Sequence, residues 1–331
     1  MAILERTDRI LMRRRFMGSL KVAVSAGLVI LLLARVGIRQ AAATLTAAHW
    51  PLLLSGFFLY VAGIALRAVR WQALLHAQGI AVALPRLVAL YYEGSFFNIM
   101  LPTGVGGDAV RAYELARTCG SGAVVVGTVL ADRAVGLLAL FLMAALVLPF
   151  SMHLLDPWLI AVVLALTVGG FGGMALFLWP RPLRKAFYAL PARLRRLIDQ
   201  PTLRKLVSSF SVYDRHALAM AASVSVLFNL MLVAVNVLIG LSLSVHVSLG
   251  YYLVCTSIAS ALLILPISIS GLGVREWGYV VLFGRVGVPA ATAVSMSLAF
   301  YLINVLAGLI GGVLYAWEGA YGIWRPAGSK P

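Results

Sequence analysis

One eleven-residue pattern, Leu-Pro-x-x-x-x-Gly-x-x-Val-Arg, occurs twice in this chain of 331 residues. The first copy runs from Leu101 to Arg111 and the second from Leu265 to Arg275, so the copies are 164 residues apart. Each copy interrupts a long apolar run with proline, glycine and an arginine. Interrupted hydrophobic segments at matching places in two halves are typical of transporters built from a repeat. The pattern therefore predicts two related halves with a binding site at the interruptions.

The composition indicates a membrane protein. Hydrophobic residues make up 62% of the chain and charged residues 11%, whereas soluble domains are about half apolar and about a quarter charged. Several apolar runs reach the roughly 20 residues that a helix needs to cross the hydrocarbon core. We therefore expect an all-α polytopic membrane protein.

The net charge of +16 has two interpretations. Strongly basic chains can bind nucleic acid, but lysine and arginine also gather in the cytoplasmic loops of membrane proteins. Five arginines within residues 6–15 precede the first apolar run, and nine cations fall in the loop 181–215. We expect no nucleic-acid partner, a bacterial inner-membrane location with both termini cytoplasmic, and contact of loop 181–215 with anionic lipids.

The apolar stretches give a topology. Six are long enough to span and uninterrupted, and they lie near residues 17–36, 51–70, 122–149, 157–179, 217–243 and 289–316. The interrupted stretches, 86–118 and 250–285, are predicted to be re-entrant hairpins, because non-helical backbone at membrane depth must be buried in protein or line a cavity. Positive charge then orients two halves, 1–156 and 157–331, as an inverted repeat. Eight full crossings are the alternative. The length of the run 17–36 argues against a cleaved signal peptide.

The first re-entrant motif covers residues 98–111. Glycines let the backbone turn and present N–H groups, and Asp108 is suited to cap a helix N-terminus, where anions also bind. Asp108, Arg111 and Glu114 lie along one helix edge and can brace one another. A structural kink is the alternative, but ionisable residues inside a membrane are costly and usually functional. The candidate ligand-binding residues here are Asn98, Gly106, Gly107, Asp108, Arg111 and Glu114.

The second re-entrant motif covers residues 265–276. It places serine hydroxyls near the turn, and its arginine, Arg275, corresponds to Arg111 in the first motif. Glu276 has no acidic counterpart, because Ala112 stands at that place. An Arg–Glu pair that anchors the hairpin is the alternative, although adjacent residues on a helix diverge. The candidate ligand-binding residues here are Ser268, Ser270, Gly271, Gly273, Arg275 and Glu276.

Four further charged residues lie in apolar runs. Asp132 and Arg133 lie about ten residues into the span 122–149, about 15 Å deep, where a charge costs about 3 kcal/mol. We expect Asp132 to pair with Arg111 or Arg275, and Arg133 to pair with Glu114 or Glu276; a structural salt bridge between helices is the alternative. Arg67 and Arg70 are expected at the inner end of the second span, where membrane anchoring and phosphate binding are both possible.

Several motifs are absent from the sequence. The two cysteines and five histidines form no metal-binding pattern, and no lysine follows a glycine, which excludes a P-loop. We therefore expect no metal, no cofactor, no catalytic residue and no direct use of ATP.

Four blocks of residues together resemble the lysylphosphatidylglycerol synthase transmembrane-region family. The resemblance spans about residues 15–318. It implies a flippase-like membrane domain, similar to the part that moves aminoacylated phosphatidylglycerol between leaflets while a separate carboxy-terminal domain attaches the amino acid. Because this chain stops at Pro331, we expect a stand-alone member without that synthase domain. The blocks are Arg67, Arg70 and Trp71; Asn98, Pro102, Gly106, Gly107, Asp108 and Arg111; Asp132, Arg133 and Gly136; and Pro266, Ser268, Gly271, Gly273, Arg275 and Glu276.

These observations favour a lipid flippase or transporter over an enzyme. Arg111 and Arg275 would hold a lipid phosphate, and the nearby carboxylates would pair with them when the site is empty. Members of the family are also associated with glycan-carrier and hopanoid lipids, which leaves the cargo open, as is the oligomeric state. The alternatives are an intramembrane transferase acting on a polyprenyl or hopanoid lipid and a small-solute secondary transporter.

Overall fold

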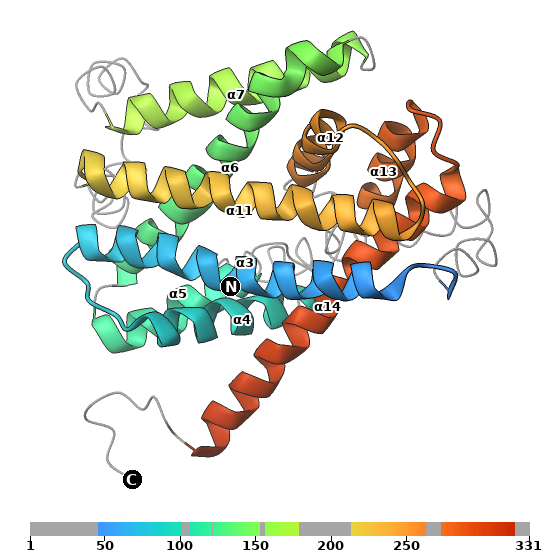
Figure 1. The fold of residues 1–331 in the computed structure, drawn as a ribbon. Coiled ribbons are helices and arrows are strands. Elements are labelled where there is room, and N and C mark those ends of the chain that lie inside the picture. Colours follow the sequence, from blue (N-terminus) through green and yellow to red (C-terminus); the bar gives the residue numbers. More distant parts are fainter. Residues whose placement is uncertain are drawn as a thin grey trace, which may run out of the picture.

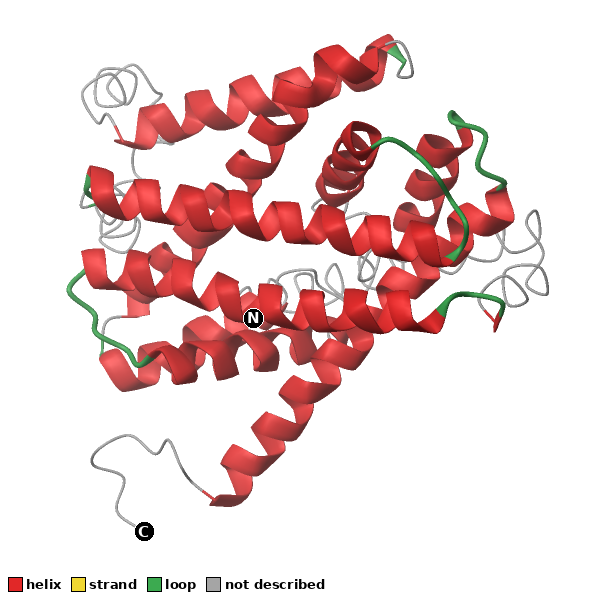
Figure 2. Cartoon of the chain, viewed as in Figure 1, coloured by secondary structure: helices red, strands yellow, loops and turns green. Residues whose placement is uncertain are grey.

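A computed structural model describes residues 46–100, 106–120, 122–152, 156–178, 213–262 and 273–321. Within these ranges the chain forms nine helices and no strands (Figure 2), which confirms the all-α prediction for this part of the protein. The predicted first span, 17–36, lies outside the described residues, as do nearly all of loop 181–215 and the second motif's Ser268, Ser270 and Gly271.

Four helices are long and apolar enough to cross a membrane. They are α3 (Trp50–Ala77), α6 (Gly122–Ser151), α11 (Arg215–Ser242) and α14 (Ala290–Tyr321), and each contains an apolar segment of 28 residues. Such a segment is about 42 Å long, which exceeds the roughly 30 Å of a hydrocarbon core. A fifth apolar helix, α7 (Pro157–Leu178), has 22 residues. These five helices coincide with five of the six predicted spans.

Helix α3 continues seven residues beyond its predicted end. About two more turns follow Arg67 and Arg70, and the helix ends at Ala77; the position of the arginines at the inner end of the membrane span stays a prediction. Leu74 and Leu75 in those turns are completely buried, so the apolar face that packs on the core extends past the arginines. Both arginines consequently lie within the helix rather than at its end.

The two interrupted stretches form helix pairs that open on opposite sides of the protein (Figure 1). Helices α4 (Leu84–Met100) and α5 (Gly106–Cys119) pack side by side and open where α3 ends. Helices α12 (Leu249–Leu262) and α13 (Val274–Gly284) open at the other side, where α11 ends and α14 begins. The arms contain 17, 14, 14 and 11 residues, fewer than the roughly 20 that a full crossing requires.

Small residues bring the helices close together. Helix α14 packs along α4, where a Cβ atom on Gly311 would lie 1.8 Å from the Tyr92 carbonyl oxygen. Helix α11 packs along α3, where Gly63 faces the Phe228 ring. Packing of this kind is what holds helices together in lipid, because hydrophobic burial does not distinguish a neighbouring helix from acyl chains.

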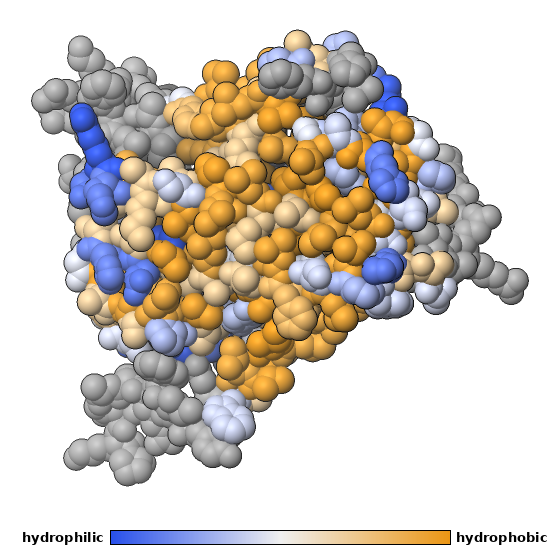
Figure 3. All heavy atoms as spheres, in the orientation of Figure 1, coloured by the Kyte–Doolittle hydropathy of each residue, from blue (hydrophilic) through white to orange (hydrophobic). Residues whose placement is uncertain are grey.

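The outer surface carries a broad apolar band. Hydrophobic residues cover the middle of the face in Figure 3, and hydrophilic residues gather toward the two ends of the long helices. Large apolar side chains on the long helices are exposed, including Leu54, Phe58, Leu227, Leu230 and Val313. Their exposure fits a lipid-facing surface, and charged residues are accordingly turned inward.

Candidate functional site: a buried cluster of arginine and aspartate

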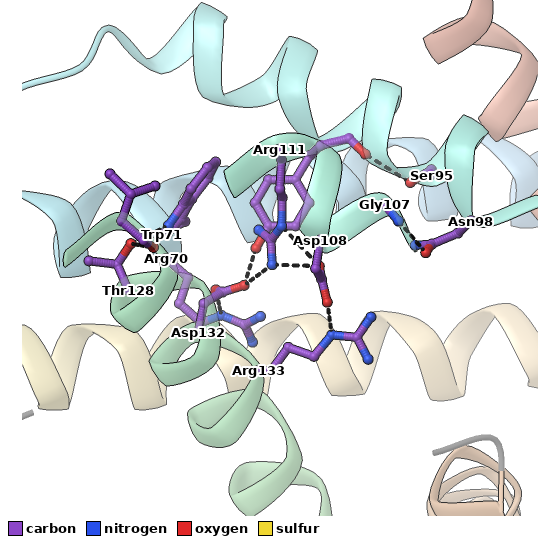
Figure 4. A network of polar contacts seen from close by, with 12 residues as sticks. Arg70, Trp71, Ser95, Asn98, Gly107, Asp108, Arg111, Thr128, Asp132 and Arg133 are labelled. Atoms are coloured by element: carbon purple, nitrogen blue, oxygen red, sulfur yellow. Dashed lines mark hydrogen bonds and ion pairs between the residues drawn. The ribbon is translucent and has the colours of Figure 1, made fainter. Parts of the chain in front are cut away.

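Charged residues from three helices meet inside the first half of the protein (Figure 4). Arg70 comes from α3, Asp108 and Arg111 come from the start of α5, and Asp132 and Arg133 come from α6. Arg70 and Asp132, which are 62 residues apart in the sequence, are in direct contact here. We call these five residues, together with Arg67, the charged cluster.

Asp132 lies at the centre of the charged cluster and is completely buried. Its Oδ1 accepts a hydrogen bond from Arg70 Nε at 2.6 Å, and its Oδ2 accepts one from Arg111 Nη2 at 2.9 Å. The Tyr91 hydroxyl donates to the same Oδ2. Two positive partners and a hydroxyl replace the water that this carboxylate loses on burial, and the predicted Asp132–Arg111 pair is confirmed.

Arg111 is 1% exposed and is held on several sides. Its Nε donates to Asp108 Oδ1 at 2.9 Å. Its guanidinium carbon lies 4.2 Å from the centre of the Tyr91 ring and 4.8 Å from that of Trp71. The Trp71 Nε1 in turn donates to Thr128 on α6 at 3.0 Å. Aromatic faces stabilise a desolvated guanidinium by about 2 kcal/mol.

Arg133 pairs with Asp108, not with either predicted partner. It lies on the side of α6 that faces the start of α5, and its side chain is 32% exposed. Glu114, one of the predicted partners, is half-buried and forms no hydrogen bond or ion pair within the described part of the chain. The expected brace between Arg111 and Glu114 is therefore also missing from this region.

Asp108 lies in the first turn of α5 rather than at its cap, because the helix already begins at Gly106. A carboxylate in the first turn is still favourable with the helix dipole. Its two oxygens face Arg111 and Arg133, so it joins α5 to α6. The predicted capping role is corrected to a role in ion pairing.

Asn98 and Gly107 fix the approach of α4 to α5. The Gly107 N–H donates to Asn98 Oδ1 at 2.8 Å, and a Cβ atom on Gly107 would lie 1.8 Å from the Gly94 carbonyl oxygen. Glycine is therefore required for this close contact. Because Asn98 already occupies the Gly107 N–H, this amide is not available to bind an anion as the sequence pattern suggested.

Arg70 and Arg67 differ in burial and in hydrogen bonding, although they are one turn apart on α3. Arg70 is 3% exposed, and besides Asp132 it donates from Nη1 to Ser225 on α11 at 3.0 Å. Arg67 is half-buried and rests near two aromatic rings, with its guanidinium carbon 4.9 Å from the centre of Tyr91 and 5.3 Å from that of Phe228. No hydrogen bond or ion pair to Arg67 occurs among the described residues.

The second half contains a smaller buried cluster. Arg275 Nη2 lies 3.2 Å from Glu276 Oε1, and Arg275 Nε donates to Ser297 Oγ on α14 at 3.1 Å. The Glu276 carboxylate also accepts the Gly273 N–H, where the backbone has a φ of +84°. The expectation that these adjacent side chains diverge is wrong, because Glu276 folds back over the helix start and Arg275 bends to meet it. Asp132 contacts Arg111 rather than Arg275.

The sequence analysis named Trp71 and Gly136 only within the family resemblance, and it missed the other neutral residues that complete the site. Tyr91, Trp71 and Ser225 contact the charged residues, and Thr128 accepts a hydrogen bond from Trp71. Gly136 makes room for Arg70, because a Cβ atom there would lie 2.6 Å from Arg70 Nη1. Tyr91 could have been found from its place beside charged residues in an apolar run. Ser225 carries no such signal. Among the described residues, no group of three or more histidine, cysteine or acidic side chains could hold a metal.

The fold and this site define a helical membrane protein with buried ion pairs beside an interrupted helix pair. Residues 18–312 match the family described as the lysylphosphatidylglycerol synthase TM region. The chain therefore belongs to this family. It is also similar to the UPF0104 membrane protein PH1989 of Pyrococcus horikoshii, with 24% identity over 323 residues that cover 89% of this chain and 95% of that protein. Membership is consistent with a lipid-related function in the membrane.

Proposed function

We propose that this protein is a transporter that moves a phosphate-bearing lipid between the leaflets of the inner membrane. The cargo would be an aminoacylated phospholipid or a glycan-carrier lipid, and the protein would not change it chemically. The observation that carries this proposal is the charge of the buried cluster. Its described members are four arginines, Arg67, Arg70, Arg111 and Arg133, and two aspartates, Asp108 and Asp132, which leaves two positive charges unbalanced.

An excess of positive charge within the helix bundle favours an anionic ligand. A single charge at membrane depth costs about 3 kcal/mol on insertion scales, so a phosphate that neutralises the excess stabilises the site. Guanidinium groups bind phosphate through paired hydrogen bonds. The aspartates would hold the arginines in place when no cargo is bound and would meet a cationic group on an aminoacylated headgroup.

The arrangement of the helices supports alternating access by two inverted halves. Helices α3 to α6 have lengths of 28, 17, 14 and 30 residues, and helices α11 to α14 have lengths of 28, 14, 11 and 32 residues. Their helix pairs open on opposite sides (Figure 1). Inverted repeats that rock about a site near the bilayer midplane are a common basis of transport. In the proposed orientation, both termini are cytoplasmic.

Reconstitution tests the transport function. The purified protein is placed in phosphatidylcholine vesicles that contain fluorescent phosphatidylglycerol, and loss of fluorescence on adding dithionite reports the lipid in the outer leaflet. We expect the inner-leaflet lipid to become accessible faster than in protein-free vesicles. An unchanged rate for phosphatidylglycerol, for its lysyl form and for a polyprenyl phosphate would contradict the proposal.

The same vesicles separate transport from the two alternatives. Mass spectrometry of the recovered lipids detects chemical modification, which an intramembrane transferase would produce and a flippase would not. Uptake of a water-soluble anion without any movement of lipid would instead indicate a solute transporter.

A further inference from the structure

Arg67 is the one cation of the charged cluster that has no ion pair within the described part of the chain. Asp132 is shared by Arg70 and Arg111, and Asp108 is shared by Arg111 and Arg133. Within the described residues, the side chain of Arg67 has aromatic rings as its neighbours and no carboxylate in contact. It lies ten residues from the end of α3 at Ala77, which is about 15 Å along the helix. A charge that is partly withdrawn from water requires compensation.

The contacts of Arg67 leave its donors available. An aromatic ring attracts a guanidinium through its face, whereas all five N–H groups of the guanidinium point outward in its own plane. Contacts with Tyr91 and Phe228 therefore stabilise the charge without using its hydrogen bonds. Arg70, by contrast, uses Nε to bind Asp132 and Nη1 to bind Ser225.

Aromatic rings continue from Arg67 in both directions. Tyr91 is shared with Arg111, since both guanidinium carbons lie within 5 Å of its centre. On the other side, Tyr60 lies seven residues before Arg67 on α3, and its ring centre is 5.9 Å from that of Phe300 on α14. Tyr60 also hydrogen-bonds to Asn304 on α14 at 2.5 Å. Arg275 in turn lies 4.8 Å from the centre of the Tyr301 ring.

Helix α3 contributes Tyr60 and Arg67 to this series, on the same face as Trp71. Tyr60, Arg67 and Trp71 are spaced by seven and four residues, which places them on the same side of a helix. The eleven residues from Tyr60 to Trp71 cover about 16 Å, roughly half the thickness of the hydrocarbon core. The series thus connects the cluster of the first half with that of the second.

We propose that Arg67 is the residue that binds the phosphate of the cargo, and that the series Arg111, Tyr91, Arg67, Tyr60 and Arg275 forms the path of the phosphate between the two halves. This inference rests on the proposed function and assigns its central step to one residue. Arg70 then has a mainly structural role, because it is held by Asp132 and Ser225, and Arg67 exchanges its ligand.

The test compares Arg67→Gln and Arg67→Lys with the wild-type protein in the vesicle assay. Arg67→Gln should lower the rate of phosphatidylglycerol crossing by about tenfold or more, the effect of losing a charge-assisted hydrogen bond. Arg67→Lys should give an intermediate rate, because it keeps the charge but loses the planar fork. Arg67 forms no ion pair or hydrogen bond within the described structure, so Arg67→Lys should keep wild-type thermal stability and Arg67→Gln should lose at most the small contribution of its ring contacts.

Arg117→Gln is the matched control. Arg117 also rests near an aromatic ring, 5.6 Å from the centre of Tyr113, but it is exposed at the end of α5 and outside the series. The Arg117→Gln variant should move phosphatidylglycerol between the leaflets at the wild-type rate. The crossing rate of a fluorescent glucosylceramide, which has no phosphate, should not change in Arg67→Gln. Uptake of radiolabelled inorganic phosphate distinguishes a free anion from a lipid headgroup as the ligand.

A measurement of lipid binding tests the role of Arg67 separately from the transport function. Native mass spectrometry of the purified proteins counts bound phosphatidylglycerol, and Arg67→Gln should retain less of it than wild type or Arg117→Gln. If the wild-type protein moves lipid and Arg67→Gln moves and binds it equally well, the role of Arg67 is wrong and the transport function stands. If the wild-type protein moves no lipid but Arg67→Gln loses bound lipid, the transport function fails and the phosphate site stands.

Discussion

Arg133 pairs with Asp108 on the neighbouring helix although Asp132 precedes it in the sequence. Consecutive residues on a helix point about 100° apart, so α6 turns Asp132 toward α3 and Arg133 toward α5. Asp132 is fully buried and Arg133 is 32% exposed. A two-residue motif thereby joins three helices, and the start of α5 depends on α6 for its position.

Replacing Asp132 by asparagine should strongly destabilise the protein. The change leaves Arg70 and Arg111 buried without their shared carboxylate, and removing one partner of a buried ion pair costs about 3–5 kcal/mol. The thermal unfolding midpoint in detergent measures the loss.

Asp156→Asn is the control for that prediction. Asp156 pairs with Arg285, but their side chains are 28% and 47% exposed, and exposed pairs contribute about 0–1 kcal/mol. Equal shifts of the midpoint for Asp132→Asn and Asp156→Asn would mean that the buried cluster has no special role in stability.

The helices follow from the sequence more reliably than their ends. Uninterrupted apolar runs predicted α6, α7, α11 and α14 within a few residues, because a helix must satisfy its own backbone hydrogen bonds in lipid. The end of α3 was missed, since the charges of Arg67 and Arg70 looked like the end of the apolar run, whereas Leu74 and Leu75 beyond them are completely buried. The span near 17–36 lies outside the described residues.

The members of the site were easier to predict than their pairing. Charges within apolar runs identified Asp132, Arg111, Asp108 and Arg133, because a charge in a membrane is too costly to be incidental. Their partners depend on how α5 and α6 are rotated about their axes, which the spacing along one helix does not determine. Periodicity correctly placed Arg111 near Asp108 but could not exclude Glu114.

Gly107→Ala should separate the arms of the first helix pair. The new methyl group would lie 1.8 Å from the Gly94 carbonyl oxygen and 2.8 Å from Asn98 Cγ, and overpacking of this kind costs about 1–3 kcal/mol. Thermal unfolding and the vesicle assay should both be impaired. Gly169→Ala on α7 is matched to it, because a methyl group there meets nothing within 4 Å; the prediction is wrong if both alanines are tolerated.

Gly136→Ala should act on Arg70 rather than on the backbone. The added Cβ would lie 2.6 Å from Arg70 Nη1 and 3.2 Å from its guanidinium carbon, so the side chain must leave Asp132 or Ser225. We expect a loss of about 1–3 kcal/mol in stability and slower lipid crossing. Gly172→Ala, whose methyl group would be free of contacts within 4 Å, should change neither quantity.

Two substitutions of Glu276 separate its charge from its capping role. Glu276→Gln still offers an oxygen to the Gly273 N–H, as glutamine does at this helix position, but leaves Arg275 without its negative partner. The expected loss is about 3 kcal/mol. Glu276→Ala also removes the cap, which is worth about 1 kcal/mol more, so the unfolding midpoints should fall in the order wild type, Gln, Ala.

The same pair of variants tests how Arg275 takes part in anion binding. Once Glu276 is neutral, the positive charge of Arg275 is no longer balanced within the described second cluster, and both variants should retain more phosphatidylglycerol than wild type in native mass spectrometry. Because Arg275 ends the proposed path, added affinity there should also slow release and reduce the rate of crossing. Unchanged lipid retention in both variants would place Arg275 outside the path and leave its pair with Glu276 as an anchor of the second helix pair.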